Sequence, residues 1–210
     1  MPLVGDIADM IMADTGGFFA PDVVSRVAVE VSRDFCRYTM ALSRYQAEVF
    51  TSDDVDHDEG YSVLMAVQPY ADTEPCGIFG ITVNGYKLAG IEREVSTPSG
   101  AAVVSPGNGG IFYRFSTQTT CQIHPLPYGG DVRFFAAFMP AVGATQIEDV
   151  LWNSYGNGVM SGIKAKLLMM PGYQTSNPNA AVVFGNEYMV AKKAARADVN
   201  RKVIGETICS

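Results

Sequence analysis

The spacing of apolar residues changes twice along this chain of 210 residues. From Asp22 to Gln46 they recur at alternating steps of four and three, which is the period of an amphipathic helix. Between residues 47 and 142 apolar and polar residues alternate instead, as in strands, and after Pro140 the helical period returns. Because short helical segments are not stable alone, the two helical ends are predicted to pack against each other.

This order of elements predicts an α+β fold, in which a helical bundle built from the N- and C-terminal helices carries an inserted antiparallel β sandwich or barrel-like domain. With 48% hydrophobic and 18% charged residues, the chain has enough apolar side chains for a core. The predicted parts are 1–46 (N-terminal helices), 47–142 (β domain), 143–198 (C-terminal helices) and 199–210 (a C-terminal arm).

The N-terminal part is expected to form a short helix over residues 3–13 and a long one from Asp22 to Gln46. The apolar stripe of the long helix consists of Val24, Ala28, Val31, Phe35, Tyr38, Leu42 and Tyr45. In the β part, Val132, Phe134, Ala136 and Phe138 alternate with Arg133, Phe135 and Ala137, and Phe112 and Arg114 alternate with Tyr113 and Phe115. Asn84-Gly85 between two short β-prone runs predicts a hairpin turn.

Two helices are predicted in the C-terminal part. Thr145 followed by Glu148 has the spacing of a capping box, and the helix after it carries Leu151, Tyr155, Gly158, Gly162, Ala165 and Met169 on one face. The two glycines on this face predict that another backbone passes close. The last helix is expected to start with Asn177 as its cap and Pro178 at its first position, with Ala181, Phe184, Tyr188, Ala191 and Ala195 on one face.

Charge and composition exclude some classes of function. The net charge of −7 and pI of about 4.8 disfavour nucleic-acid binding as the main activity, because proteins that grip phosphates are usually basic. No run of eighteen apolar residues and no signal-peptide pattern at the start are found, so a soluble, non-exported protein is expected. The four cysteines form no C-x-x-C pair, which favours free thiols over a zinc site.

Local motifs point to no catalytic residue, no cofactor and no metal ligand. The acidic run 53–59 lacks the glycine and the closing glutamate of a calcium loop, since Glu59 and Met65 stand there, and is interpreted as a solvated loop; cation binding by it stays open. His57 and His124 belong to no nucleophile or zinc motif, which argues against an enzyme. As an alternative function, the β part could bind a ligand or glycan among Tyr86, Phe112, Tyr113 and Phe115, although aromatic residues at such positions usually form the core.

The one basic segment of this acidic chain lies near its C-terminus. It contains Lys192, Lys193, Arg196, Arg201 and Lys202, followed by the apolar residues Val203, Ile204 and Ile208. Basic residues favour the dipole at a helix C-terminus, which by itself could explain them. The apolar residues beyond them lack a local partner in the sequence, so this tail is expected either to fray or to dock on another subunit.

Several segments, in order along the chain, resemble the head-to-tail adaptor proteins of tailed bacteriophages, also called head completion or connector proteins. Arg33-Asp34-Phe35-Cys36-Arg37-Tyr38-Thr39 is close to the Phe-Cys-x-x-Thr of that family's first long helix, and Val83-Asn84-Gly85-Tyr86-Lys87-Leu88 resembles its hairpin. The C-terminal half matches in Ala136-Ala137-Phe138-Met139-Pro140, in the helix from Ile147 through Gly162, in Lys166-Leu167-Leu168-Met169-Met170-Pro171-Gly172, and in Asn177-Pro178 leading into Ala180-Ala181 and Phe184. Where the family usually carries tryptophans, this chain has Leu42, Tyr45 and Tyr173.

The resemblance implies a structural virion protein at the head-tail neck, present in the host cytoplasm during assembly. Its expected partners are the portal protein, tail tube or nozzle proteins and further copies of itself, in a ring expected to be a dodecamer because the portal is. Phe35, Gly158, Gly162 and Phe184 would pack the helices of the ring body, the β domain would face tail components, and the basic arm would dock on the portal. Genomic DNA would pass without specific binding, since negative walls repel phosphates.

Overall fold

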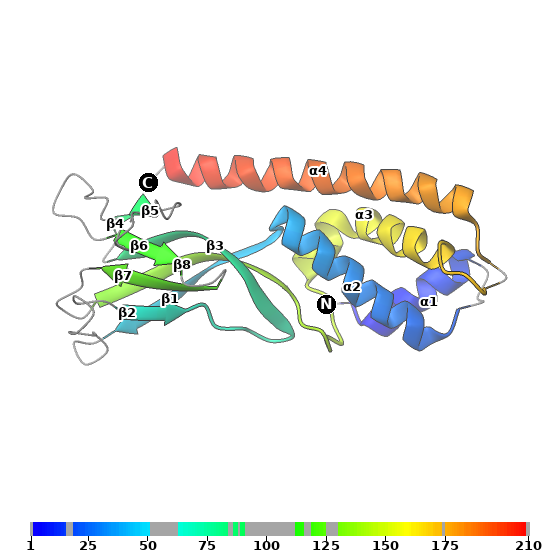
Figure 1. The fold of residues 1–210 in the computed structure, drawn as a ribbon, viewed down its shortest axis with the longest axis horizontal. Helices are drawn as coiled ribbons and strands as arrows, with labels where there is room; N and C mark the ends of the chain where they lie inside the picture. The colour runs from blue at the N-terminus through cyan, green and yellow to red at the C-terminus, as the bar shows by residue number, and fades with distance from the viewer. Residues whose placement is uncertain are drawn as a thin grey trace, which may run out of the picture. The chain divides into compact units, whose positions relative to one another are not determined.

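A computed structural model describes residues 2–15, 19–50, 63–83, 86–87, 89–90, 112–115, 119–124, 130–173 and 175–208 (Figure 1). The chain divides into two compact units. The helical unit consists of Met1–Leu42, Pro69–Glu74 and Phe138–Ser210, and the β unit of Ser43–Gln68 and Pro75–Ala137. The predicted α+β fold, with helices from both ends of the chain in one bundle, is therefore confirmed.

The helical unit contains α1 (Val4–Thr15), α2 (Pro21–Thr39), α3 (Asp149–Leu168) and α4 (Pro178–Ile208). α3 packs against α2 and α4, and α1 packs mainly against α2 (Figure 1). Leu3 forms an isolated antiparallel β-bridge with Gln146 in the segment before α3, and the Val4 amide donates to the Thr145 carbonyl at 2.9 Å. The fully buried side chains include Ile7, Ile11, Val24, Phe35, Ile147, Leu151, Ile163 and Leu167. Both ends of the chain thus contribute to one hydrophobic core.

The strands are β1 (Leu42–Phe50), β2 (Val63–Ala66), β3 (Thr73–Val83), β4 (Tyr86–Lys87), β5 (Ala89–Gly90), β6 (Phe112–Phe115), β7 (Thr120–His124) and β8 (Gly130–Pro140). They form two four-stranded sheets, in the orders β1-β8-β3-β4 and β2-β7-β6-β5. The predicted hairpin is confirmed by the antiparallel pairing of Val83 with Tyr86, whereas β5 and β6 run parallel. The alternation predicted for 132–138 is confirmed up to Ala136, since Val132, Phe134 and Ala136 are buried while Arg133 is exposed; it is wrong at Ala137, which is also buried.

The prediction of one helix from Asp22 to Gln46 is wrong, because α2 ends at Thr39 and β1 begins at Leu42. Met40 adopts a left-handed conformation with φ of 60°, and its amide donates to the Cys36 carbonyl at 2.7 Å, which closes the last turn. A spacing of three or four residues between apolar side chains is also compatible with a helix followed by a strand. Leu42 and Tyr45 therefore fit the helical stripe in the sequence without belonging to it in space.

The predicted capping box at Thr145 is also wrong. Both the hydroxyl and the amide of Thr145 donate to Oδ2 of Asp72, at 3.0 and 3.1 Å, and Glu148 instead occupies the N-cap position of α3. A capping threonine would accept a hydrogen bond from a backbone amide of the first turn, but α3 begins only at Asp149, so Thr145 lies too far before the helix. Asp72 lies 73 residues away in the sequence, so local spacing could not reveal this contact.

The predicted start of the last helix is confirmed. The Asn177 side chain accepts a hydrogen bond from the Ala180 amide at 3.1 Å, and Pro178 is the first residue of α4. The helix continues without interruption to Ile208, past the predicted start of the arm at residue 199. Val199 is buried, with 6% of its surface exposed, so the helical unit reaches at least this residue.

Close packing of α4 against α3 and α2 depends on two glycines of α3. A Cβ atom at Gly158 would lie 2.5 Å from Ala191 Cβ, and one at Gly162 would lie 2.7 Å from both the Tyr188 ring and Val31. Such distances are far below van der Waals contact. The expectation that another backbone passes close is confirmed at Gly158, where the Ala191 Cα of α4 lies 3.9 Å from the added Cβ, whereas the groups close to Gly162 are side chains of α4 and α2.

We expect Gly162→Ala to lower the free energy of unfolding of the helical unit by roughly 1–3 kcal/mol, because the added methyl group overpacks the contact with Tyr188 and Val31. Gly162→Leu should destabilise further. The measurement is urea unfolding followed by fluorescence of Trp152, which lies on α3 and is the single tryptophan of the chain.

Gly185→Ala is the matched control for this prediction. Gly185 is a glycine in the interior of α4 with open space around its added Cβ, so alanine there should be neutral or stabilise by up to about 1 kcal/mol. Equal unfolding midpoints for the two alanine variants would contradict close packing at Gly162.

Candidate functional site

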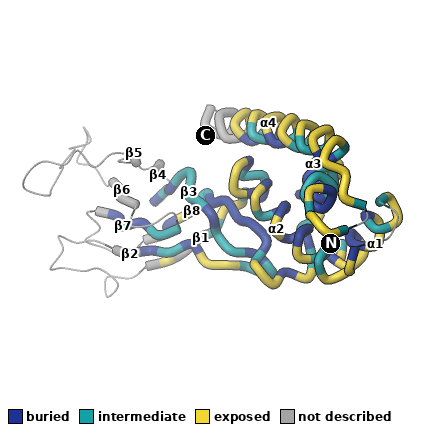
Figure 2. Tube along the Cα trace, turned by 45° about the vertical axis from the view of Figure 1, so that its right-hand side comes forward, coloured by how far each residue is buried: buried dark blue, intermediate teal, exposed yellow. Residues whose placement is uncertain are grey.

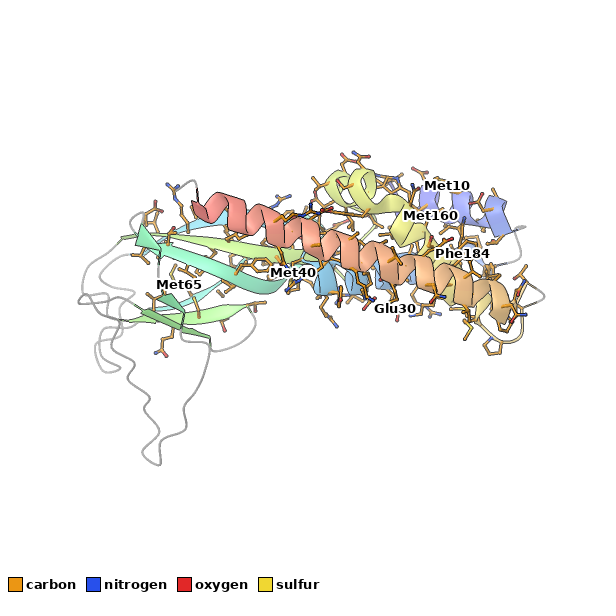
Figure 3. All side chains as sticks on the ribbon, turned by 90° about the horizontal axis from the view of Figure 1, so that it is seen from above. Met10, Glu30, Met40, Met65, Met160 and Phe184 are labelled. Carbon is orange, nitrogen blue, oxygen red and sulfur yellow. The ribbon has the colours of Figure 1, made fainter. Side chains whose placement is uncertain are left out.

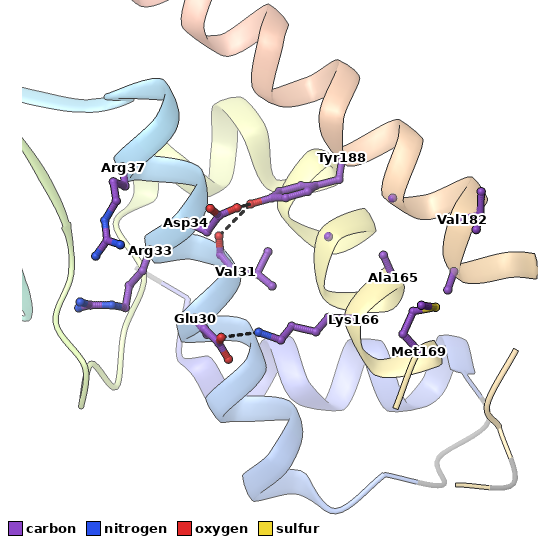
Figure 4. Close-up of a pocket in the computed structure, with 13 residues that line it drawn as sticks. Glu30, Val31, Arg33, Asp34, Arg37, Ala165, Lys166, Met169, Val182 and Tyr188 are labelled. Atoms are coloured by element: carbon purple, nitrogen blue, oxygen red, sulfur yellow. Dashed lines mark hydrogen bonds and ion pairs between the residues drawn. The ribbon is translucent and has the colours of Figure 1, made fainter. Parts of the chain in front are cut away.

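Asp34 of α2 is the centre of a polar cluster that holds α4. Its Oδ2 atom accepts hydrogen bonds from Lys192 Nζ at 2.8 Å and from the Tyr188 hydroxyl at 2.7 Å (Figure 4 shows the Tyr188 bond). The same hydroxyl is 3.2 Å from the Val31 carbonyl oxygen. We call Asp34, Tyr188 and Lys192 the Asp34 cluster; it fixes the rotation of α4 about its own axis.

The Lys192 ammonium group is almost completely enclosed, with 8% of its side chain exposed. It lies 4.6 Å from the ring centroid of Tyr38 and 5.1 Å from that of Tyr188, which is the range of cation–π attraction. A buried ammonium is tolerated when it is paired and hydrogen-bonded. Two rings and one carboxylate meet this requirement here.

The environment of the cluster shifts two pKa values. Partial burial acts to raise the pKa of Asp34, but the hydrogen bonds from Lys192 and Tyr188, with the positive charges of Lys192 and Arg37, outweigh it and hold this pKa below its ordinary value of 3.8. Burial, together with the neighbouring Asp34 carboxylate, raises the pKa of the Tyr188 phenol well above its ordinary value. Asp34 is therefore charged and Tyr188 neutral at pH 7.

A groove of about 760 Å³ runs beside the cluster, between α2, α3 and α4 (Figure 4). Its charged lining residues are engaged with protein groups: Lys166 pairs with Glu30, and Arg33 donates to the Pro140 carbonyl at 2.6 Å and to Glu74 at 2.5 Å. Lys166 thus joins α3 to α2, and Arg33 joins α2 to one end each of β8 and β3. We call this groove the α2 groove.

The opposite side of α4 borders a second depression, next to α3. A groove of about 690 Å³ is lined by Met10 of α1, Met160 of α3 and Phe184 of α4, among others (Figure 3). It continues into a groove of about 590 Å³ between α3 and α4, because both share Gly158, Ser161 and Ala191 as lining residues. We call the smaller one the α3 groove.

The side of α4 that faces away from α2 and α3 carries four large apolar residues beside the exposed Asn186 and Lys193. Val182, Val183, Met189 and Val190 are 60%, 56%, 44% and 67% exposed, and Figure 2 shows how much of α4 is exposed. We call these four residues the valine ridge. α4 therefore exposes four large apolar residues in addition to the apolar residues that it buries against the bundle, among them Ala181, Ala195 and Val199.

The structure separates the residues predicted to form a docking arm. Lys192 is buried in the Asp34 cluster, so its charge is used within the helical unit. Arg196 donates to the Tyr38 carbonyl at 3.4 Å, Arg201 pairs with Asp198, and Lys193 is exposed. Lys202, Val203, Ile204 and Ile208 continue α4, and their side chains lie outside the described part of the structure.

The four residues predicted to pack helices lie at helix contacts. Phe35 is completely buried, with its ring centroid 5.6 Å from that of Tyr155 and 6.0 Å from that of Tyr188. Gly158 and Gly162 face α4, and the Phe184 ring lies 5.5 Å from the Lys164 ammonium. All four therefore lie at contacts between helices of the helical unit.

Other predicted features fall largely outside the residues that the structure describes. The acidic run 53–59 with His57 lies there, and so do the side chains of His124, Tyr86, Phe112, Tyr113 and Phe115. Within the described ranges, no three or more histidine, cysteine, aspartate or glutamate side chains gather as a metal site. In those same ranges no helix has the length and hydropathy to cross a membrane.

Neither the valine ridge nor the Asp34 cluster is among the features predicted from the sequence. The ridge has a signal in the pairs Val182-Val183 and Met189-Val190, which stand seven residues apart, two turns of one helix. The Asp34 cluster has no such signal in the sequence, because nothing there relates Asp34 to a lysine 158 residues away.

No protein-family model matches this chain, and a search of curated proteins finds no relative of it.

We expect Asp34→Asn to destabilise the helical unit more than Lys192→Met. The first change leaves a buried ammonium without its counter-charge, at a cost of about 3 kcal/mol. The second leaves a carboxylate that is 59% exposed and can be solvated by water, so its cost should be about 1 kcal/mol. Urea unfolding followed by Trp152 fluorescence measures both, and the reverse order would contradict the pairing described here.

The decrease in the free energy of unfolding at acid pH, the acid limb of the pH–stability curve, should also depend on Asp34. Because its pKa is lower in the folded chain than in the unfolded one, the stabilisation is complete above pH 3.8 and is lost as the pH falls through the lower folded-state pKa. Asp34→Asn should therefore flatten the loss of stability below pH 4 relative to the parent. Identical acid limbs for Asp34→Asn and the parent would refute this.

Proposed function

We propose that this chain is a non-catalytic structural subunit of a ring that joins the portal vertex of a tailed bacteriophage to its tail and forms part of the DNA channel. The observation that carries the proposal is the valine ridge, four large apolar residues on the outer side of α4. Contiguous exposed apolar residues of this kind are typical of surfaces that a protein partner covers. A subunit of a permanent assembly needs such a surface.

The location of the segments that resemble the adaptor family supports the proposal. Phe35 lies in the core of the helical unit, Lys166–Gly172 spans the end of α3, and Asn177-Pro178 starts α4. Segments far apart in the sequence therefore meet in one bundle, with the β unit inserted between its helices. A chain built in this way has one part for the ring body and a separate part for a different partner.

The acidic composition is compatible with a conduit for DNA. A net charge of −7 repels phosphates, so a genome could pass through such a ring without sticking. In this proposal the protein acts at the neck of the virion and resides in the host cytoplasm before assembly, with the portal protein, tail tube or nozzle proteins and its own copies as partners.

The native mass of the purified chain, alone and mixed with the portal protein of the same phage, tests this function. We expect the portal ring to gain about one chain for each portal subunit, because a ring that follows the portal's rotational symmetry repeats each contact in every subunit. A portal ring of unchanged mass, with the chain folded, would refute the proposal and would favour the ligand-binding alternative for the β unit.

Removing residues 200–210 should weaken binding to the portal without unfolding the helical unit. This cut retains Val199, which is buried, and the Lys192 pair with Asp34. The truncated chain should melt like the parent, as followed by Trp152 fluorescence, and should bind the portal ring at least about tenfold more weakly in native-mass titrations. Unchanged portal affinity would remove this segment from the contact.

A further inference from the structure

The valine ridge separates the two grooves of the helical unit. Val182 forms part of the wall of the α2 groove, and Val183 and Val190 form part of the wall of the α3 groove. The ridge therefore has an α2 edge, with Val182 and Met189, and an α3 edge, with Val183 and Val190. Both the ridge and the grooves belong to the helical unit and need no residue of the β unit.

The α3 groove is shaped for apolar side chains. Gly158, Ser161 and Ala191 are small lining residues, and the glycine and the alanine are in close contact, so little side-chain volume fills the groove. The two valines of the α3 edge form one wall above them. A helix that presents small apolar side chains fits a groove of this kind.

The two residues on each edge of the ridge have the same spacing along α4. Val182 and Met189 are seven residues apart, which is about 10.5 Å along a helix. Val183 and Val190 have the same separation. The α2 edge of one α4 can therefore lie in register beside the α3 edge of another.

Charges on the two sides of α4 are complementary. On the α2 side, the lining residues of the α2 groove together with Glu74, Lys192 and Arg196 make five basic residues and three acidic ones. On the α3 side, the larger of the two grooves is lined by Asp14, Glu187, Asp198 and Lys164, and Arg201 pairs with Asp198, which makes three acidic residues and two basic ones. Several of these charges pair within the chain, and the remaining net charge is positive on the α2 side of α4 and negative on the α3 side.

This arrangement of charge selects the direction of packing. If a two-fold axis related the two copies, their α4 helices would run in opposite directions. Each edge of the ridge would then face the same edge of the other copy, and like charges would meet. If both helices run in the same direction, the positive side of one copy meets the negative side of the next. Opposite charges across an interface favour this second arrangement and disfavour the first.

We infer that a second copy of this chain docks the α2 edge of its valine ridge, Val182 and Met189, into the α3 groove, with the two α4 helices running in the same direction. The contact is heterologous, so every copy uses its ridge on one neighbour and its groove on the other, and it closes into a ring when the rotation allows. The inference rests on the proposed function in that it identifies the surfaces by which the ring subunits meet.

Two variants test the contact. Val182→Arg changes the ridge and leaves the α3 groove intact, whereas Val190→Arg changes the groove wall and leaves Val182 and Met189 intact. Both positions are exposed and arginine is a good helix former, so both variants should melt like the parent. Each alone should self-associate roughly 100-fold more weakly than the parent in sedimentation velocity.

An equimolar mixture of the two variants should form dimers and nothing larger, because one intact ridge and one intact groove remain. Val142→Arg, at a 77% exposed position outside α4, is the matched control and should associate like the parent. A parent that stays monomeric up to roughly 1 mM would overturn the inference. A mixture that stays monomeric would also overturn the inference. Mixing restores a contact only when it joins two different surfaces, one of which is intact in each variant.

Portal binding by the same proteins separates this inference from the proposed function. If the parent binds the portal ring but does not self-associate, the contact is overturned and the function stands. If the variants lose self-association as expected while even the parent does not bind the portal, the contact stands and the function is overturned.

Discussion

The close approach of α4 to α3 is the contact on which the arrangement of the helical unit depends. Glycine at positions 158 and 162 removes the side chains that would hold the helices apart, and Ala191 and Tyr188 occupy that space. At this separation Tyr188 can reach past α3 to Asp34 on α2, where Lys192 joins it. Two residues without side chains therefore allow the C-terminal helix to bond to the N-terminal half of the chain.

The contact also determines which side of α4 faces outward. A lysine on the bundle side is stabilised by a carboxylate and two aromatic rings, and the valines are left on the opposite side. In a single chain this arrangement exposes apolar surface without a compensating gain. In an assembly it leaves an apolar ridge with charges of opposite sign on its two sides, which can supply both affinity and a direction of packing.

Much of the fold was predictable from the sequence because it depends on local periodicity and local capping. The two changes of apolar period identify the helical ends and the β insertion, and Asn177-Pro178 marks the start of α4. The predictions that failed depend on distant groups. The Thr145 hydroxyl and amide donate to the distant Asp72, and α2 ends where the strand β1 joins a sheet with β8. Neighbouring letters in the sequence do not show which remote partner competes for a group.

The sequence by itself determined the class of the fold, the close approach at the glycines of α3 and the start of the last helix, because each follows from periods and caps within a few residues. The tertiary structure decided the roles of individual residues on α4. The sequence analysis placed Lys192 in a docking arm, but the structure buries it against Asp34, and Val182 and Val190 are left exposed. Which face of a helix points outward depends on where its neighbours lie, and that is a property of packing between segments up to 158 residues apart.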